Sequence, residues 1–252
     1  MMKKIAYFLV FACSLLFAGC FETTEDVTIN KDGGGAFSNT IDLSKMVGLL
    51  KQMGGDDAQK LKDTDTTISL AGITDSIAGF TPQQKKVIDQ GTMKLTLNME
   101  DEKLVIKLNL PFQKVEDVAM LQQVLPKISE AAMKKLPGTD QMPPTAANDT
   151  SSEVKSFDDF FDVSYTDKTI TKTLNKTRYD AEKDGEYMKA LQQVSDMGSP
   201  IVANYVINLP RPATKVEGKL AKLSDDKMKV TLTATSDDFF SDPSKFEYHI
   251  EY

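Results

Sequence analysis

Two runs of alternating residues constrain the fold of this chain more than any other feature. Apolar side chains occupy every second position in both runs: Met93, Leu95, Leu97 and Met99 in the first, and Leu104, Ile106, Leu108 and Leu110 in the second. The polar residues Glu100 to Lys103 separate the runs. Successive side chains of a strand point to opposite faces. The pattern therefore predicts an antiparallel hairpin with one buried face and one solvated face.

A helical pattern follows this hairpin. Apolar residues recur at helical spacing, at Val118, Leu121, Leu125, Ile128, Ala132 and Leu136. Such a stripe is wide enough to cover the apolar face of the hairpin. Pro126 lies within it and lacks a backbone donor, so a kink or a break is expected there.

The first part of the chain combines a flexible lead, a hairpin and two short helices. Residues Phe21 to Asp26 read as the lead. The β-prone runs around Asn30 to Gly35 predict a tight hairpin, because glycine reaches positive φ at little cost. Ser44 is a candidate helix cap, with Gly54-Gly55 ending that helix, and Thr81-Pro82 predicts the start of a second helix.

The second part repeats the mixture of strands and helices. Two strands are predicted between Val163 and the Thr-rich run that follows Ile170. A helical stretch is predicted near Ala181 to Met197. Ile201 to Leu209 is apolar on both faces, which is typical of a central strand. Two alternating runs follow, Met228 to Ala234 and Phe246 to Tyr252.

These patterns predict an α+β fold, with antiparallel β-sheet covered on one face by helices. We expect a signal peptide over residues 1–19, a lipid-anchored N-terminal lobe over 20–136 and a C-terminal lobe over 156–252. Residues 137–155 are rich in Pro, Thr, Ala, Asn and Ser, which indicates a linker or a long loop. Whether the two lobes form one domain or two stays open.

The N-terminal residues are typical of a secretory leader. Lys3 and Lys4 precede an apolar run from Ile5 to Ala18. This run is shorter than the roughly 20 residues that a membrane-spanning helix needs. It therefore predicts a signal peptide that is removed.

The segment Phe17-Ala18-Gly19-Cys20 resembles the lipobox of bacterial lipoproteins. The resemblance implies cleavage between Gly19 and Cys20 and attachment of lipid to the Cys20 thiol. Phe17 departs from the Leu that is commoner in the family. The alternative is an ordinary signal peptide cleaved elsewhere, with Cys20 incidental. Phe21 follows the cysteine where an Asp would resemble an inner-membrane retention signal, so the outer membrane is favoured.

A second resemblance concerns the body of the protein. The opening hairpin, the Leu209-Pro210-Arg211-Pro212 segment and the Ser224-Asp225-Asp226 turn are similar to those of LppM-type domains and other uncharacterised bacterial lipoproteins. The resemblance implies an envelope-associated module without catalytic activity.

Cysteine content and charge exclude several classes of protein. The chain has two cysteines, and Cys13 lies in the predicted leader, so the mature chain can form no internal disulfide. The net charge is −7, and it becomes −9 when Lys3 and Lys4 are removed, with 28 basic and 37 acidic residues remaining. An acidic surface argues against nucleic acid as a partner and against binding to anionic lipid headgroups.

The sequence offers few candidates for catalysis or metal binding. His249 is the single histidine, and a surface position is expected for it. Without a second histidine or a free cysteine, a zinc site of the usual type is excluded. The segment Asn30 to Gly35 echoes a calcium loop, but Ile41 stands where the loop needs a bidentate Glu. We therefore predict no catalytic residue, no metal and no cofactor.

Three pairs of neighbouring carboxylates remain, namely Asp158-Asp159, Asp225-Asp226 and Asp237-Asp238. Such pairs commonly cap helices or form turns. A glycosidase would instead hold two carboxylates across a cleft. The absence of tryptophan, a common sugar platform, weighs against that interpretation.

The leading hypothesis is a lipid-anchored cell-envelope lipoprotein with a non-enzymatic binding or structural role. Its partners would be the membrane, through acylated Cys20, and an envelope protein. One alternative is a carrier of an apolar ligand held between sheet and helices. The other is a carboxylate-based hydrolase, which predicts acidic residues converging in one cleft with displaced pKa values.

Overall fold

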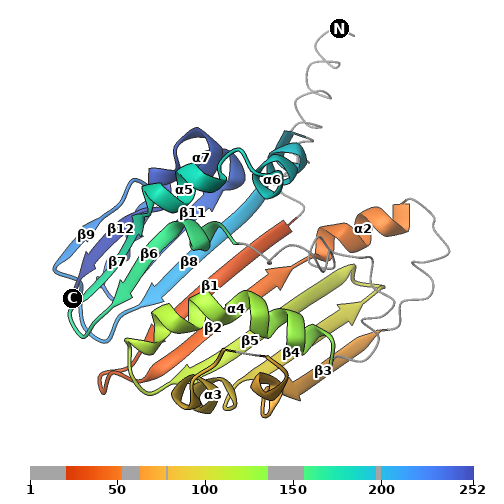
Figure 1. The fold of residues 1–252 in the computed structure, drawn as a ribbon, viewed down its shortest axis with the longest axis horizontal. Coiled ribbons are helices and arrows are strands. Elements are labelled where there is room, and N and C mark those ends of the chain that lie inside the picture. The colour runs from red at the N-terminus through yellow and green to blue at the C-terminus, as the bar shows by residue number, and fades with distance from the viewer. Residues whose placement is uncertain (1–20, 53–62, 78, 136–155, 197–199) are drawn as a thin grey trace, which may run out of the picture.

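The computed structural model describes residues 21–52, 63–77, 79–135, 156–196 and 200–252. It has the α+β architecture that the sequence predicts, with two sheets and helices packed beside them (Figure 1). Within the described residues, eight strands form the larger sheet in the spatial order β10-β11-β8-β1-β2-β5-β4-β3. Their bounds are β1 (Phe21–Ile29), β2 (Gly35–Asp42), β3 (Thr64–Ser69), β4 (Thr92–Asn98), β5 (Lys103–Phe112), β8 (Ile201–Asn208), β10 (Ala221–Leu223) and β11 (Lys229–Thr235).

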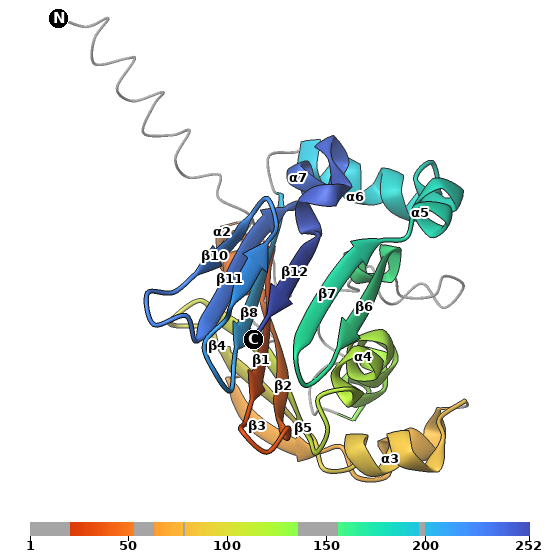
Figure 2. The same ribbon diagram turned by 90° about the vertical axis from the view of Figure 1, so that its left-hand side faces the viewer.

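The smaller sheet has the order β6-β7-β12-β9, and all its pairs are antiparallel. Its strands are β6 (Phe161–Tyr165), β7 (Thr169–Leu174), β9 (Lys215–Glu217) and β12 (Tyr248–Glu251). Figure 2 shows this sheet beside the β8 and β1 part of the larger sheet. The apolar core lies between these two layers.

Six helices and three 3₁₀ turns occur in the described part of the chain. They are α2 (Ser44–Gln52), α3 (Pro82–Ile88), α4 (Asp117–Met133), α5 (Lys176–Glu182), α6 (Glu186–Asp196) and α7 (Ser236–Ser241), with η2 (Ile73–Ser76), η5 (Phe157–Phe160) and η6 (Pro243–Phe246). Helix α4 contacts β5 of the larger sheet and β6 of the smaller one. Helix α4 therefore lies next to β6, in the same layer as the smaller sheet, and packs against β5 of the larger sheet (Figure 2).

The hairpin of β4 and β5 confirms the strongest sequence prediction. Leu97 pairs with Leu104 and Met93 with Leu108, so the alternating apolar residues share the buried face. Helix α4 buries its own apolar stripe against this layer, including Val118, Leu121, Ile128 and Ala132.

Helix α4 is continuous across Pro126, so the break that was one expected outcome does not occur. A proline inside a helix costs about 3 kcal/mol through the lost hydrogen bond and steric conflict. Val118, Leu121 and Ile128 are buried along α4. Burial of each of these side chains contributes roughly 1.5–3 kcal/mol, and together they outweigh the cost of the proline.

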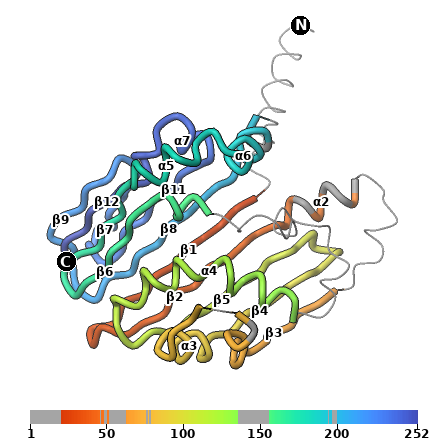
Figure 3. The backbone as a smooth tube through the Cα atoms, in the orientation of Figure 1, coloured from red at the N-terminus to blue at the C-terminus, as the bar shows by residue number. Residues whose placement is uncertain are grey.

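The predicted flexible lead is wrong, because residues 21–26 belong to β1. This strand lies inside the larger sheet, antiparallel to β2 and parallel to β8, as the backbone trace in Figure 3 shows. The segment reads as a lead because it is polar. Its inward-facing Glu25 is buried among polar partners, and Val27 and Ile29 complete the inward face.

The turn between β1 and β2 is the tight hairpin turn that was predicted. Asn30 N donates to Gly34 O at 2.7 Å, and Gly33 adopts a positive φ of 85°. Gly35 is required for a different reason, since a Cβ there would lie 1.9 Å from the Thr28 carbonyl oxygen. Gly34 N also donates to Asp32 Oδ1 at 3.0 Å, which accounts for the aspartate of the calcium-like segment.

Helix α3 begins as predicted. The Thr81 hydroxyl accepts from Gln84 N, the Gln84 side chain accepts from Thr81 N, and Pro82 follows the cap. Helix α2 begins at Ser44, the residue predicted as its cap, and the Ser44 hydroxyl accepts from Leu104 N of β5 at 3.1 Å. The predicted end of that helix, Gly54-Gly55, lies outside the described residues.

The helical stretch predicted near Ala181 to Met197 contains α6 and the last two residues of α5, and the two helices are separated at Gly185. Glycine is unfavourable inside a helix by about 1 kcal/mol relative to alanine. The Gly185 amide donates to the Glu182 carbonyl at 2.8 Å, which closes the end of α5. The Asn175 side chain caps the start of α5 by accepting from Arg178 N.

The two halves of the chain share the larger sheet. Strands β8, β10 and β11 come from the predicted C-terminal lobe, yet β8 pairs in parallel with β1 from Phe21 to Thr28. The sheet is therefore mixed and not purely antiparallel. The predicted linker, 137–155, lies outside the described residues, and the segments on either side of it contribute to one sheet.

Candidate functional site

A buried cluster of polar and charged side chains lies between the two sheets. Five residues from five elements meet there: Glu25 of β1, Gln122 of α4, Asp158 of η5, Lys172 of β7 and Tyr205 of β8. Each strand residue faces inward because it falls on the buried side of an alternating pattern. We call these five residues the core polar cluster.

Lys172 is the cation of the core polar cluster and is only 1% exposed. Its ammonium group forms an ion pair with the Asp158 carboxylate. It also lies 4.0 Å from the ring centroid of Tyr205, 5.0 Å from that of Phe161 and 5.8 Å from that of Phe246. The negative faces of aromatic rings attract a cation, so these contacts help to offset the loss of water around Lys172.

Glu25 is the second carboxyl group of the core polar cluster and is 7% exposed. Gln122 Nε2 donates to Glu25 Oε2 at 2.8 Å. Burial, and then the charge of Asp158, raises the pKa of Glu25 to about 8, while Lys172 and Gln122 act in the opposite direction. At neutral pH the Glu25 carboxyl is therefore mainly protonated and can donate a hydrogen bond to Asp158.

Three tyrosines complete the polar surroundings. Tyr205 Oη donates to Asp158 Oδ1 at 2.9 Å. Burial raises the pKa of Tyr165, Tyr205 and Tyr248, and the charges of Glu25 and Asp158 add to the effect. All three hydroxyls thus remain protonated donors.

The chemistry available to the core polar cluster is proton sharing and charge neutralisation inside the core. When Glu25 is protonated, the positive charge of Lys172 balances the negative charge of Asp158, and the buried cluster is close to neutral. Aromatic rings surround it: the ring of Phe239 lies 4.7 Å from that of Phe157 and 5.5 Å from that of Phe246. Both carboxyl groups have little contact with solvent, since Glu25 is 7% exposed and the Asp158 side chain is 16% exposed.

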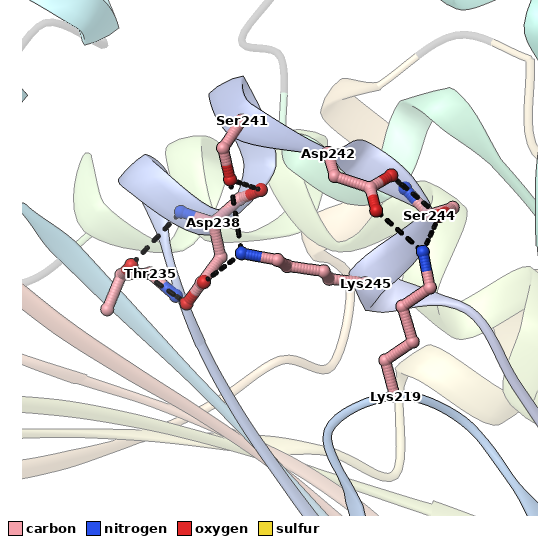
Figure 4. Close-up of polar contacts among 7 residues, drawn as sticks. All are labelled: Lys219, Thr235, Asp238, Ser241, Asp242, Ser244 and Lys245. Atoms are coloured by element: carbon pink, nitrogen blue, oxygen red, sulfur yellow. Dashed lines mark hydrogen bonds and ion pairs between the residues drawn. The ribbon is translucent and has the colours of Figure 1, made fainter.

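A second polar cluster lies at the surface, around α7 and η6 (Figure 4). Asp238 accepts from Lys245 Nζ at 2.8 Å and forms a capping box with Thr235. The Lys245 hydrogen bond lowers the pKa of Asp238. Asp242 accepts from Lys219 Nζ at 2.6 Å, and this contact, followed by that of Ser244, lowers the pKa of Asp242 to about 2.

The predicted carboxylate pairs behave largely as caps and turns. Asp159 and Asp238 close capping boxes with Ser156 and Thr235, and Asp226 accepts from Ser224 Oγ at 2.6 Å in the turn before β11. Asp158 and Asp237 differ: the Asp158 carboxylate enters the core polar cluster, and Asp237 accepts from the Ser195 hydroxyl of α6.

The remaining candidate residues are placed as follows. His249 is half-buried on β12, and its Nε2 lies 3.0 Å from Glu251 Oε1. The predicted cleavage and lipidation residues, Gly19 and Cys20, lie outside the described residues. In the described segments, no group of three His, Cys, Asp or Glu side chains is arranged to hold a metal ion.

A small surface pocket lies between α3 and the start of α4. Its volume is about 30 Å³, and Val87, Gln90 and Asp117 contribute to its lining. This space suits a water molecule. Asp117 Oδ2 is buried with no hydrogen-bond partner among the described residues, so a water there would satisfy a polar group.

Sequence reasoning missed four residues of the core polar cluster: Glu25, Gln122, Lys172 and Tyr205. The signal for Lys172 is its position two residues after Ile170, on the same face of β7. Gln122 follows Leu121 on the buried side of α4. A charged residue at an inward position indicates a partner, but the sequence does not identify which one.

Comparisons with known proteins gave no further information on the site. The chain matches no protein-family model, and neither the curated proteins nor the solved structures gave a match. Among the described helices, none has the length and apolar character needed to cross a membrane.

Proposed function

We propose that this protein is a cell-envelope lipoprotein, anchored through acylated Cys20, with a non-enzymatic binding or structural role. One observation carries the proposal. The lipobox-like segment ends at Cys20, and β1 begins at the next residue, Phe21. The residue that would follow the acylated cysteine thus already belongs to a strand of the larger sheet.

The acyl chains on Cys20 would hold the protein at the membrane in this proposal. Each buried methylene of an acyl chain contributes about 0.8 kcal/mol, and a second chain makes the attachment durable. The acidic body adds no electrostatic attraction to anionic lipids.

The anchor is tested by labelling cells with a fatty-acid analogue and separating membrane from soluble fractions. The Cys20→Ala variant should lose the label and leave the membrane fraction. Cys13→Ala is the matched control, since this cysteine lies in the segment to be removed, and it should keep the label. Label on Cys20→Ala, or a mature protein that begins elsewhere, would contradict the proposal.

The outer membrane is the proposed location, on the basis of Phe21. Phe21→Asp should redistribute the protein to the inner membrane in a Gram-negative host, whereas Phe21→Ser should not. Density separation of the two membranes provides the measurement. Equal distributions of the two variants would remove the basis for this location.

The non-enzymatic role is supported by the way the core polar cluster uses its charges. Lys172, Asp158 and Tyr205 are bonded to one another beneath aromatic rings, an arrangement that stabilises a core. Crosslinking in intact envelopes, followed by isolation of the acylated protein, should recover a specific envelope partner. Cys20→Ala, which is not at the membrane, is the control.

A carboxylate-based hydrolase is the second candidate. The observation that favours it is the convergence of Glu25 and Asp158, with the pKa of Glu25 raised to about 8. A protonated carboxyl beside an ionised one is the arrangement that general acid catalysis uses. Hydrolysis of a glycoside or ester substrate that is abolished in Glu25→Gln, with the fold retained, would replace the non-enzymatic role with this one.

A further inference from the structure

We propose that the end of the fold at which β1 begins lies directly against the bilayer, in contact with zwitterionic lipid headgroups. The proposal rests on the acylation of Cys20 and adds the orientation of the body. We call this end of the fold the anchor end. It comprises the start of β1, the residues beside it in the larger sheet, and helices α2, α6 and α7.

The first argument is the absence of slack between the anchor and the body. Consecutive Cα atoms are 3.8 Å apart, so Phe21 follows the modified residue at that distance. Phe21 is already paired with Ile201 of β8, and Glu22 is paired with Asp42 of β2. Because β1 has neighbours on both sides, its first residues cannot separate from the sheet without breaking two ladders of hydrogen bonds.

The second argument is that several described elements begin or end beside this point. Strand β8 begins at the anchor end, β2 and β11 end there, and α2 and α7 follow those two strands directly. Ser236 Oγ of α7 lies 2.8 Å from Ser195 Oγ of α6 and accepts from Ile201 N at 3.1 Å. These contacts tie α6 and α7 to the start of β8, and Figure 2 shows both helices at one end of the molecule.

The third argument identifies the lipid. Exposed side chains of both signs occur at the anchor end, including Lys51, Lys103, Glu102 and Asp237. Lys51 pairs with Glu102 at 2.9 Å, so its charge is already matched. Tyr187 of α6 and Phe240 of α7 are half-buried and pack against the core, so the charged side chains dominate this surface. A surface that carries both signs of charge fits a zwitterionic bilayer and needs no anionic lipid.

The opposite end of β1 should be remote from the membrane. A nine-residue strand spans about 30 Å at roughly 3.3 Å per residue, and the β1–β2 turn lies at its far end. Lys31 in that turn and Lys103 at the start of β5 are both exposed. They form a matched pair of positions at the far end and the anchor end.

The experiment uses single tryptophan variants, since the chain contains no tryptophan. Acylated full-length Lys103→Trp and Lys31→Trp proteins are placed in phosphatidylcholine vesicles that contain a headgroup-nitroxide lipid. Circular dichroism checks that both variants are folded. We expect quenching of Lys103→Trp at least threefold greater than that of Lys31→Trp, unchanged in high salt.

The outcomes separate the orientation from the anchor. Failure of the acylated preparation to sediment with vesicles would overturn the anchor and, with it, the orientation. Sedimentation with equal quenching of the two variants would overturn the orientation alone. A flexible Gly-Ser insertion between Cys20 and Phe21 should preserve sedimentation and at least halve the quenching of Lys103→Trp. Unchanged quenching after that insertion would overturn the argument from slack.

Discussion

Lys172 connects the smaller sheet to the larger one through its buried ammonium group. Its ammonium group is buried on β7, pairs with Asp158 and contacts the ring of Tyr205 on β8. Removing one partner of a buried ion pair leaves an uncompensated charge, which is far more costly than the pair itself is stabilising.

Lys172→Met should therefore lower the free energy of unfolding by about 3–5 kcal/mol. The remaining Asp158 carboxylate would lose its cation while Glu25 stays close. Denaturant titration measures the effect. Lys94→Met is the matched control, because Lys94 pairs with Asp65 at 2.9 Å on the surface, where the loss should not exceed about 1 kcal/mol. Equal stability of the two variants would show that the Lys172 pair is not important for the core.

Glu25 should make the stability of the protein dependent on pH. Its folded pKa of about 8 lies above the value of 4.5 for an unperturbed Glu, so the native protein keeps a proton that the unfolded chain releases. This contribution is complete below pH 4.5 and is lost as the pH rises through 8. Over that interval one proton lowers the free energy of unfolding by up to about 1.4 kcal/mol per pH unit.

Glu25→Gln should remove this dependence while preserving the shape of the side chain. The difference between variant and wild type is expected to be small near pH 5 and to favour the variant increasingly up to pH 8. Thermal or denaturant unfolding at several pH values provides the test. Parallel curves for the two proteins across this range would contradict the assignment of the proton to Glu25.

At the scale of elements, side-chain caps determine where several helices begin. The side chains of Thr81, Ser156 and Thr235 each accept from a backbone amide of the first turn. In return, the side chain three residues later accepts from the backbone amide of the cap residue. Helix α7 is short, so the groups at its ends are a large part of what stabilises it. It also connects β11 of the larger sheet with η6 and β12 of the smaller one.

Thr235→Ala should lower the free energy of unfolding by about 1 kcal/mol, because the Asp238 amide loses its acceptor. Thr177→Ala on the exposed surface of α5 is the control and should be neutral or slightly stabilising, since alanine has the higher helix propensity. Chemical denaturation distinguishes the two. A neutral Thr235→Ala would show that the cap contributes little to α7.

At the scale of the whole molecule, the parallel pairing of β1 with β8 joins the two halves of the chain. Strand β1 is also paired with β2, so the larger sheet is continuous from β10 to β3. The core polar cluster adds a second connection, because Glu25 and Gln122 come from the first half and Asp158 and Lys172 from the second.

The described fold should therefore unfold as one cooperative unit. Hydrogen exchange in increasing denaturant should show protection of β1, β8 and β7 lost at the same concentration. Circular dichroism should give the same midpoint. Loss of protection in β6 and β7 well before β1 and β2 would instead indicate that the smaller sheet is an independent unit.

Much of the local structure could be predicted because its causes lie within a few residues. The β4–β5 hairpin follows from strict alternation, the β1–β2 turn from its glycines, and the start of α3 from Thr81-Pro82. The interruption at Gly185 and the strand over 21–26 were missed. In both cases the helical or polar pattern of the neighbouring residues obscured the boundary that packing and hydrogen bonding establish.

The core polar cluster could not be predicted in the same way. Glu25 and Lys172 each occupy an inward position in a strand, but their common partner, Asp158, belongs to a pair that otherwise resembles a helix cap. Recognising the site required knowing that β1 and β7 face each other across the core.

The sequence alone determined the α+β class, the turns and the caps, because backbone conformation and side-chain alternation are set by near neighbours. The predicted leader and Cys20, on which the proposed anchor rests, are also features of the sequence alone. Only the tertiary structure decided that β1 pairs with β8, and that a protonated carboxyl, a carboxylate and a lysine meet in the core. The pairing of β1 with β8 and the approach of Glu25 to Asp158 and Lys172 join residues more than one hundred positions apart, for which burial and charge neutralisation, not local propensity, decide the partners.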